Sequence, residues 1–382
     1  MGISALIALA TTIVAAPAQA EPITLAIASP LSEPGDVRSG EAIRKSAELW
    51  IDHINQQGGI IGREVELGKF DTKGKPEVGA AVVERAITER NASAILGVWS
   101  SSVVLAMMDV VHRYNVPMLC FYSWSDDITK KNYPQVFRTG PYNSQIAGDV
   151  APYVKHKGYD KVTVLAEDTD YGIGWADAFV KAMKGTGLEV NVVQFQAQAQ
   201  DLTPQLVRIR AQRPDAIIVQ AVYAASNLSI KQAREVGYQG DIITGWDWPV
   251  LPDFWPTVGK AGVGVVYPTF YDPSLSLTAE GERFRKLYTE RYGSDPAIFQ
   301  YFLWDNFNAV KAAIEKARSA KPAALVETLP AVSFEGTTGQ IGFQRKEGTV
   351  HFNQWEGFSM FFKEMTAQGQ TGAEAKPVYS VK

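Results

Sequence analysis

The chain has 382 residues, of which 46% are hydrophobic and 20% are charged. This length is enough to bury one large core, although two cores of ordinary domain size are the usual solution. The formal net charge is −4 and no block of Lys or Arg interrupts the chain, so nucleic acid is not an expected partner.

The first twenty residues, MGISALIALATTIVAAPAQA, have the pattern of a secretory signal peptide. An apolar core over 5–16 is followed by the small-x-small end at 18–20, which predicts cleavage before Glu21, although Lys and Arg are missing from the start. The apolar part is too short to span a bilayer, and no later segment approaches the roughly 20 apolar residues needed. We therefore expect a mature protein in the periplasm.

The sequence contains a single cysteine, Cys120, so no intrachain disulfide can form. No cysteine follows the predicted cleavage site, so we expect no lipid anchor. We expect a freely diffusing monomer.

After the predicted cleavage site, short β-rich runs alternate with longer amphipathic runs. Strands are predicted over 23–29, 64–71, 92–98 and 116–122, with helices over 39–59, 76–90 and 102–114. A second series has helices over 143–157, 172–184, 203–212 and 224–237, and strands over 161–168, 188–195, 215–221 and 241–246. Alternation of this kind predicts α/β architecture, with parallel sheets covered by helices on both faces. Because the rhythm restarts after 137–143, we expect two doubly wound lobes.

The last third of the chain follows a different pattern. Long helical segments over 278–293 and 297–320 lead into a strand-rich stretch that includes 339–353. The residues after about 366 are polar, and we expect them to be frayed.

The sequence offers no catalytic, metal-binding or cofactor motif. It contains no G-x-S-x-G elbow, no G-x-G-x-x-G or Walker loop and no H-E-x-x-H, and its four histidines lie far apart in the chain. The acidic cluster of Glu167, Asp168 and Asp170 follows a strand and precedes a helix, which is typical of turn and N-cap residues. We expect neither catalytic residues nor a cofactor.

Three consecutive serines, Ser100, Ser101 and Ser102, stand where an apolar strand ends and a helix begins. Hydroxyls and unpaired backbone N–H groups at a helix N-terminus can bind an anion. The alternative is that all three serve only as caps or solvated turn residues.

Four other predicted strand ends carry similar residues, at 121–127, 167–172, 220–226 and 244–249. Aromatic and hydroxyl side chains recur there in both series. Open α/β sheets bind ligands outside the carboxyl ends of their strands, so these segments predict the two walls of one cleft.

With these features the chain resembles the leucine/isoleucine/valine-binding family of periplasmic solute-binding proteins. Members of this family are the receptors of ABC importers and have the type I fold. The resemblance spans nearly the whole mature chain. The residues that carry it are 28–71, GVWSSS (97–102), VFRTGPYN (136–143), VLAEDTDYGIGW (164–175) and IKQAREVGY (230–238).

The resemblance implies two lobes joined by three crossovers near residues 140, 267 and 351. The first lobe would hold 21–140 and 268–350, and the second 141–267 and 351–382. It also implies that a small carboxylate-bearing solute is captured by hinge closure and delivered to a membrane permease.

The family's binding residues match positions at the five strand ends. The resemblance assigns the ligand carboxylate to Ser100, with Ser101 adjacent, and to groups in 122–125. It assigns second-lobe contacts to two tyrosines and the ligand ammonium to Asp247, an Asp where the family has Glu. The departures from the family are aromatic and suggest a remodelled pocket: Trp99 stands where a disulfide is common, and Trp124 where a threonine is. The complete set of expected ligand-binding residues is Trp99, Ser100, Ser101, Tyr122, Ser123, Trp124, Tyr171, Tyr223 and Asp247.

The leading ligand is an amino acid with a branched-chain or other apolar or aromatic side chain. If arginines neutralise Asp247, the ligand would instead be an aromatic or other small organic acid, or an amide. Two further alternatives are a sensor that reports to a membrane kinase and a hydrolase using Ser100 or Ser101 as nucleophile. The hydrolase lacks a histidine placed by any motif to act as base.

Overall fold

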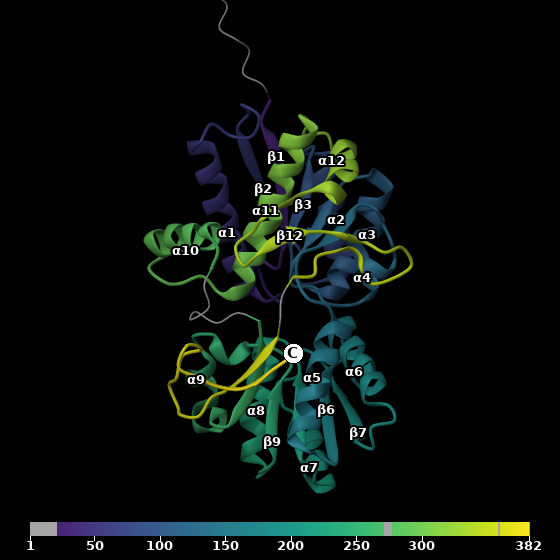
Figure 1. Ribbon diagram of the computed structural model, residues 1–382, viewed down its shortest axis with the longest axis vertical. Coiled ribbons are helices and arrows are strands. Elements are labelled where there is room, and N and C mark those ends of the chain that lie inside the picture. Colours follow the sequence, from purple (N-terminus) through teal and green to yellow (C-terminus); the bar gives the residue numbers. More distant parts are fainter. Residues whose placement is uncertain (1–20, 271–276, 358–359, 382) are drawn as a thin grey trace, which may run out of the picture.

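Two seven-stranded sheets organise the chain, one in each of two lobes arranged along the long axis of the molecule (Figure 1). The computed structural model describes residues 21–270, 277–357 and 360–381. The expected signal peptide, 1–20, lies outside the described residues.

The first sheet has the strand order β13-β14-β5-β4-β3-β1-β2. Its strands are β1 (Ile23–Ser29), β2 (Val65–Asp71), β3 (Ala94–Val98), β4 (Met118–Cys120), β5 (Val136–Arg138), β13 (Gln344–Arg345) and β14 (Phe352–Gln354). The helices of this lobe are α1 (Val37–Gln56), α2 (Pro76–Thr88), α3 (Ser101–Tyr114), α4 (Asp127–Lys130), α10 (Ala279–Tyr292), α11 (Ile298–Ala317) and α12 (Pro322–Thr328). A two-stranded sheet of β11 (Ser333–Glu335) and β12 (Gln340–Gly342) also belongs to this lobe.

The second sheet has the order β16-β15-β10-β9-β8-β6-β7. Its strands are β6 (Lys161–Glu167), β7 (Glu189–Phe195), β8 (Ala216–Gln220), β9 (Asp241–Thr244), β10 (Val265–Thr269), β15 (Phe361–Glu364) and β16 (Lys376–Ser380). Its helices are α5 (Asn143–Lys157), α6 (Asp170–Met183), α7 (Thr203–Gln212), α8 (Tyr223–Glu235) and α9 (Phe254–Val258), with a 3-10 turn, η1, at Trp248–Val250.

Both sheets therefore repeat one topology, in which the second strand of each series lies outside the first. Strands β1 to β5 pair in parallel, and so do strands β6 to β10. In the two sheets, the antiparallel pairs are β13 with β14, β10 with β15 and β15 with β16. Sheets of this order bind ligands where the connections diverge to either face, at the carboxyl ends of the first and third strands. Those ends are β1 and β3 in one lobe and β6 and β8 in the other.

Local sequence explains the central elements. The strands β3 and β8 are buried along their whole length, as continuous apolar runs predict. Helix α1 begins after Asp36, whose side chain accepts a hydrogen bond from the N–H of Ser39, and the chain leaves it through Gly58 and Gly59 at φ 94° and 75°. On β4, the Cys120 side chain is fully buried and its thiol faces the carbonyl of Phe137 at 3.5 Å.

The chain passes between lobes after β5, after β10 and after β14 (Figure 1). The second and third passages lie later in the chain than the crossovers near residues 267 and 351 that the resemblance implies. Strand β10 continues to Thr269 in the second sheet, whereas β14 pairs with β5 through Gln354 and Arg138 in the first. Residues 352–354 are therefore not part of the second sheet. The buried Arg138 guanidinium holds β14 there by donating to Gln354 Oε1 at 2.6 Å.

The expectation of a frayed tail after residue 366 was also wrong. Strand β16 pairs antiparallel with β15, with Phe361 opposite Ser380 and Glu364 opposite Lys376. Strand β16 lies at the edge of the sheet, so its backbone forms ladder hydrogen bonds with β15 on one side only. Its side chains remain in contact with solvent. A polar edge strand of this kind lacks the apolar run from which strands are predicted.

Within the described residues, no helix combines the length and apolar character needed to cross a membrane.

Candidate ligand-binding site

Two cavities lie where the carboxyl ends of the strands from both lobes meet. The smaller cavity, about 50 Å³, is lined by Trp99, Ser100, Ser101, Ser102, Tyr122, Trp124, Glu167, Thr169, Tyr171, Val222 and Trp248. The larger, about 720 Å³, is lined by residues that include Tyr223 and Asp247. The structure thus brings together eight of the expected residues at these two cavities, and Ser123 lines neither.

Ser100 is the N-cap residue of α3, with φ −87° and ψ 135°, but its side chain makes no capping hydrogen bond. It is half-buried and lines the smaller cavity. The first backbone N–H groups of α3 lack intrahelical acceptors, as at any helix N-terminus, and the helix dipole favours negative charge there. Ser100 therefore occupies the N-cap position without capping the helix through its side chain, which leaves the hydroxyl available to a ligand or to solvent.

Ser101 and Ser123 instead hold two loops together. The Ser101 hydroxyl oxygen accepts from the backbone N–H groups of Trp124 at 3.0 Å and Ser125 at 3.1 Å. The Ser123 hydroxyl, fully buried, donates to the carbonyl of Trp99 at 2.8 Å. The backbone donors after β4 that the resemblance assigned to a ligand are therefore already bound by Ser101.

Aromatic side chains from both lobes form the walls of the smaller cavity. Trp99 stacks on Tyr122 with ring centroids 5.0 Å apart, and Trp124 meets Tyr122 at 4.8 Å and Tyr171 at 5.3 Å edge-on. Among the described residues, the buried indole N–H groups of Trp124 and Trp248 have no hydrogen-bond acceptor. A buried donor without a partner costs about 1–3 kcal/mol, so these groups favour a ligand that brings acceptor atoms.

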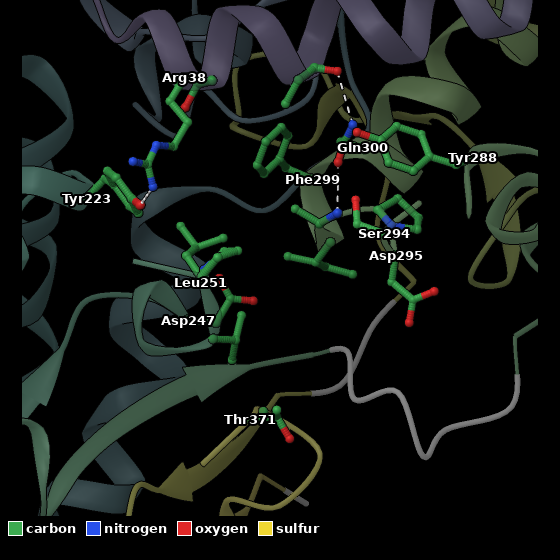
Figure 2. Close-up of a pocket in the computed structure, with 18 of the residues that line it drawn as sticks. Arg38, Tyr223, Asp247, Leu251, Tyr288, Ser294, Asp295, Phe299, Gln300 and Thr371 are labelled. Carbon is green, nitrogen blue, oxygen red and sulfur yellow. Dashed lines mark hydrogen bonds between the residues drawn. The ribbon is translucent and has the colours of Figure 1, made fainter. Parts of the chain in front are cut away.

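Asp247 follows β9 and lies on the wall of the larger cavity (Figure 2). Its side chain is 4% exposed and accepts from the hydroxyls of Thr269 at 3.2 Å and Tyr122 at 3.4 Å. Burial raises the pKa of Asp247 to about 7. No Lys or Arg of the described residues forms an ion pair with it, and Arg38, which lines the same cavity, pairs with Asp253 instead. The organic-acid alternative assumed that arginines neutralise Asp247, and no arginine among the described residues forms that ion pair.

A second buried carboxyl group, that of Glu167, lines the smaller cavity at the end of β6. It accepts from the Val222 N–H at 2.8 Å and from the Thr169 hydroxyl at 2.8 Å, while burial raises its pKa. Thr169, rather than a neighbouring aspartate, caps α6 by accepting from Gly172 N–H. The sequence predicted 167–172 as part of a cleft wall, although it suggested only a turn or N-cap role for Glu167 itself.

Tyr223 begins α8 in a backbone conformation unusual for a residue with a side chain, with φ 30°. Its hydroxyl accepts from Arg38, whose guanidinium carbon lies 4.8 Å from the tyrosine ring centroid. Arg38 also forms an ion pair with Asp253. One side chain at the start of α1 thus bridges to two residues of the second lobe, and Figure 2 shows its contact with Tyr223 beside the cavity. Nothing in the sequence around Arg38 indicates this contact.

Comparison with known proteins agrees with this architecture. The family model for periplasmic binding protein matches residues 22–365, so the chain belongs to the periplasmic binding protein family. The Leu/Ile/Val-binding protein BraC3 of Rhizobium johnstonii is 26% identical over 311 residues, covering 80% of this chain and 82% of that protein.

Solved structures show the same fold. A leucine-binding protein LivK from Thermotoga maritima superposes with a TM-score of 0.83 at 23% identity, covering 94% of this chain and 99% of that chain. An ABC transporter solute-binding protein from R. palustris in complex with benzoate has a TM-score of 0.81 at 20% identity, covering 94% of this chain and 96% of that chain. The two lobes therefore have the type I periplasmic binding protein fold.

Proposed function

We propose that this protein is the periplasmic receptor of an ABC importer and captures an α-amino acid with an apolar or aromatic side chain. The observation that carries the proposal is Asp247, a buried carboxyl group without a cationic protein partner. An ionised carboxylate in such a place is costly unless a cation or strong donor meets it. A ligand ammonium group supplies that partner.

The ligand carboxylate is received at the start of α3. The Ser100 hydroxyl is not engaged in capping, and the N-terminal N–H groups of the helix add donors and a favourable dipole. The indole N–H groups of Trp124 and Trp248 supply two further donors at the same cavity. A zwitterion held between α3 and Asp247 therefore satisfies groups of both lobes.

Capture proceeds by hinge closure of the two lobes, and the loaded protein delivers its solute to a membrane permease. The names of relatives such as BraC3 support an amino-acid ligand. In this proposal residues 1–20 are removed on export, no lipid anchor is attached and the protein acts as a monomer. The lobes that close correspond to the two sheets, with the third passage after Gln354.

A small organic acid is the second candidate, since the aromatic walls and unpartnered indole donors also suit a planar carboxylate such as the benzoate bound by the R. palustris protein. A hydrolase has less support, because no histidine lines either cavity in the described part of the chain.

Calorimetry with an amino acid and its deaminated analogue, on wild type and on Asp247→Ala, tests the proposal. Removing one partner of a buried charge pair costs about 3–5 kcal/mol, so the variant should lose at least roughly 100-fold in affinity for the amino acid. Asp177→Ala, on the exposed face of α6, is the matched control and should bind as wild type. Tighter binding of the deaminated acid to wild type would reject the amino acid and leave the receptor function in place.

A further inference from the structure

The two cavities differ more than tenfold in volume, about 50 Å³ against about 720 Å³. One water needs roughly 10–15 Å³ of such space, so the smaller one has room for a few heavy atoms, which suits a polar head group better than a large side chain. The larger one falls within the 300–1,000 Å³ range of pockets that enclose drug-sized ligands.

Asp247 connects these two spaces. Its carboxyl group lines the larger cavity and accepts a hydrogen bond from Tyr122, which lines the smaller one. An ammonium group at Asp247 would therefore sit at the junction. From there a carboxylate directed to Ser100 in the smaller cavity would leave the substituent on the α-carbon to enter the larger cavity.

The larger cavity has a mixed lining, with charged side chains such as Arg38, Glu41 and Lys45 on α1 and an apolar and aromatic part of the wall elsewhere. Val250 and Leu251 line it from the second lobe, and Ile298 lines it from the start of α11. Four aromatic side chains, two from each lobe, complete this part of the wall: Tyr223, Tyr267, Tyr288 and Phe299. Figure 2 shows Tyr223, Leu251, Tyr288 and Phe299 around one open space.

We infer that the larger cavity, formed by Asp247, Leu251, Phe299 and the residues around them, receives the side chain of an aromatic α-amino acid. The inference rests on the proposed function and narrows it. A branched aliphatic side chain would leave most of the apolar wall without contacts, and each lost contact forfeits dispersion energy. An aromatic ring buries more apolar surface and gains edge or stacking contacts with the surrounding rings.

The test is calorimetry with alanine, leucine and phenylalanine on wild type and on two variants that fill the cavity from opposite walls. Leu251→Trp fills it from the second lobe and Ala42→Phe fills it from α1. Val207→Trp, at a position on α7 that is 43% exposed, controls for the added bulk. Two variants are used because either one alone can perturb local packing, and thermal melting verifies that each is folded.

Wild type should bind phenylalanine at least tenfold more tightly than leucine. Both filling variants should weaken phenylalanine binding at least tenfold while changing alanine binding less than twofold, and Val207→Trp should change neither. Leucine binding as tightly as phenylalanine, or equal losses for alanine and phenylalanine in the filled variants, would overturn the inference.

The deaminated analogue 3-phenylpropionate separates this inference from the proposed function. If it binds more tightly than phenylalanine and suffers the same loss in the filled variants, the cavity assignment stands and the ammonium assignment fails. If leucine binds to wild type but neither phenylalanine nor 3-phenylpropionate does, the inference is overturned and the proposed function stands. If none of the three binds, both are overturned.

Discussion

The three consecutive serines show how neighbouring residues of one type acquire different tasks. The Ser100 side chain makes no capping bond at the edge of the smaller cavity, whereas the Ser101 side chain accepts two backbone N–H bonds from the loop after β4. Their position at a strand end could be predicted from the sequence. The direction of each hydroxyl could not, because it depends on the backbone of residues 124 and 125, more than twenty positions away.

We therefore expect Ser100→Ala and Ser101→Ala to behave differently. A hydrogen bond to a charged group contributes on the order of 1.5–3 kcal/mol, so Ser100→Ala should weaken ligand binding roughly 10- to 150-fold and leave the melting temperature unchanged. Ser101→Ala should lower the melting temperature, because it leaves two buried N–H donors unpaired. Calorimetry and thermal melting measure the two effects. Equal affinity of Ser100→Ala and wild type would show that this serine does not hold the carboxylate.

The buried Asp247 carboxyl group predicts a pH dependence of binding. Its pKa in the free protein is raised to about 7, so below that value the group is mostly protonated and must lose its proton before it can pair with an ammonium group. Affinity should therefore fall as the pH decreases, by roughly 30-fold between pH 8 and pH 5.5.

Calorimetry across this pH range, in buffers of different ionisation enthalpy, would measure the affinity and the released proton together. Asp247→Asn should remove most of the dependence of affinity on pH. Any dependence that remains would come from Glu167, because burial raises the pKa of that group as well. An affinity that rises toward low pH contradicts an ammonium at Asp247.

Asp247 also affects the stability of the unliganded protein. Because the folded state holds this proton more tightly than the unfolded chain, the free energy of unfolding should decrease as the pH rises from about 4 to about 7. Asp247→Asn removes the buried charge, so it should flatten this part of the stability curve in urea unfolding. A variant with an unchanged curve would show that another group causes the dependence.

Among the secondary structure elements, those with long apolar patterns were predictable and the short ones were not. Strands β3 and β8 are buried apolar runs, and their periodic neighbours α3 and α8 were expected close to their observed positions. Strand β14 has only three residues and β16 is a polar edge strand. Both exist because of pairing partners elsewhere in the chain, and local sequence carries no sign of those partners.

Helix α1 makes a contact between the two lobes that the sequence did not predict. Arg38, in its first turn, bridges to Tyr223 and Asp253 of the second lobe. A partly exposed ion pair contributes about 0.2–1 kcal/mol and a cation–π contact about 0.5–1 kcal/mol. Because both contacts join the lobes, their loss should act on opening of the closed form.

Arg38→Ala should therefore increase the ligand dissociation rate roughly 3- to 30-fold and change the association rate little. Arg38→Lys keeps the charge but not the planar stacking group, so its rate should be intermediate. Stopped-flow fluorescence measures both rates, and Arg90→Ala, at an exposed position outside both cavities, is the control. A dissociation rate equal to that of wild type in Arg38→Ala would show that this bridge does not hold the closed form.

On the scale of the whole molecule, the repeated topology of the two sheets explains why the site is shared. Each sheet presents its strand ends to the other, so residues from β3 and β4 meet residues from β6, β8 and β9. The sequence indicated the repeat and the recurring aromatic residues at strand ends. It gave no measure of the space between lobes, because that space depends on how large side chains such as Tyr122 and Trp124 pack against each other.

Closure on the ligand should be visible in solution. Because Trp99, Trp124 and Trp248 lie at the interface between lobes, saturating ligand should shift tryptophan emission and reduce the radius of gyration measured by X-ray scattering. Neither signal should change on addition of a non-binding amino acid at the same concentration. Unchanged scattering and emission with a ligand whose binding calorimetry has verified would contradict closure.

The single cysteine on β4 has a practical consequence. Cys120 is completely buried and its thiol has a pKa raised by burial to about 11, so almost no reactive thiolate is available at neutral pH. The native protein should resist thiol-directed labelling, while the denatured chain should take up one equivalent of reagent. A cysteine introduced at the rim of the cleft would then be the sole attachment point for a fluorescent dye, and the protein could report solute concentration as a biosensor without removal of its own cysteine.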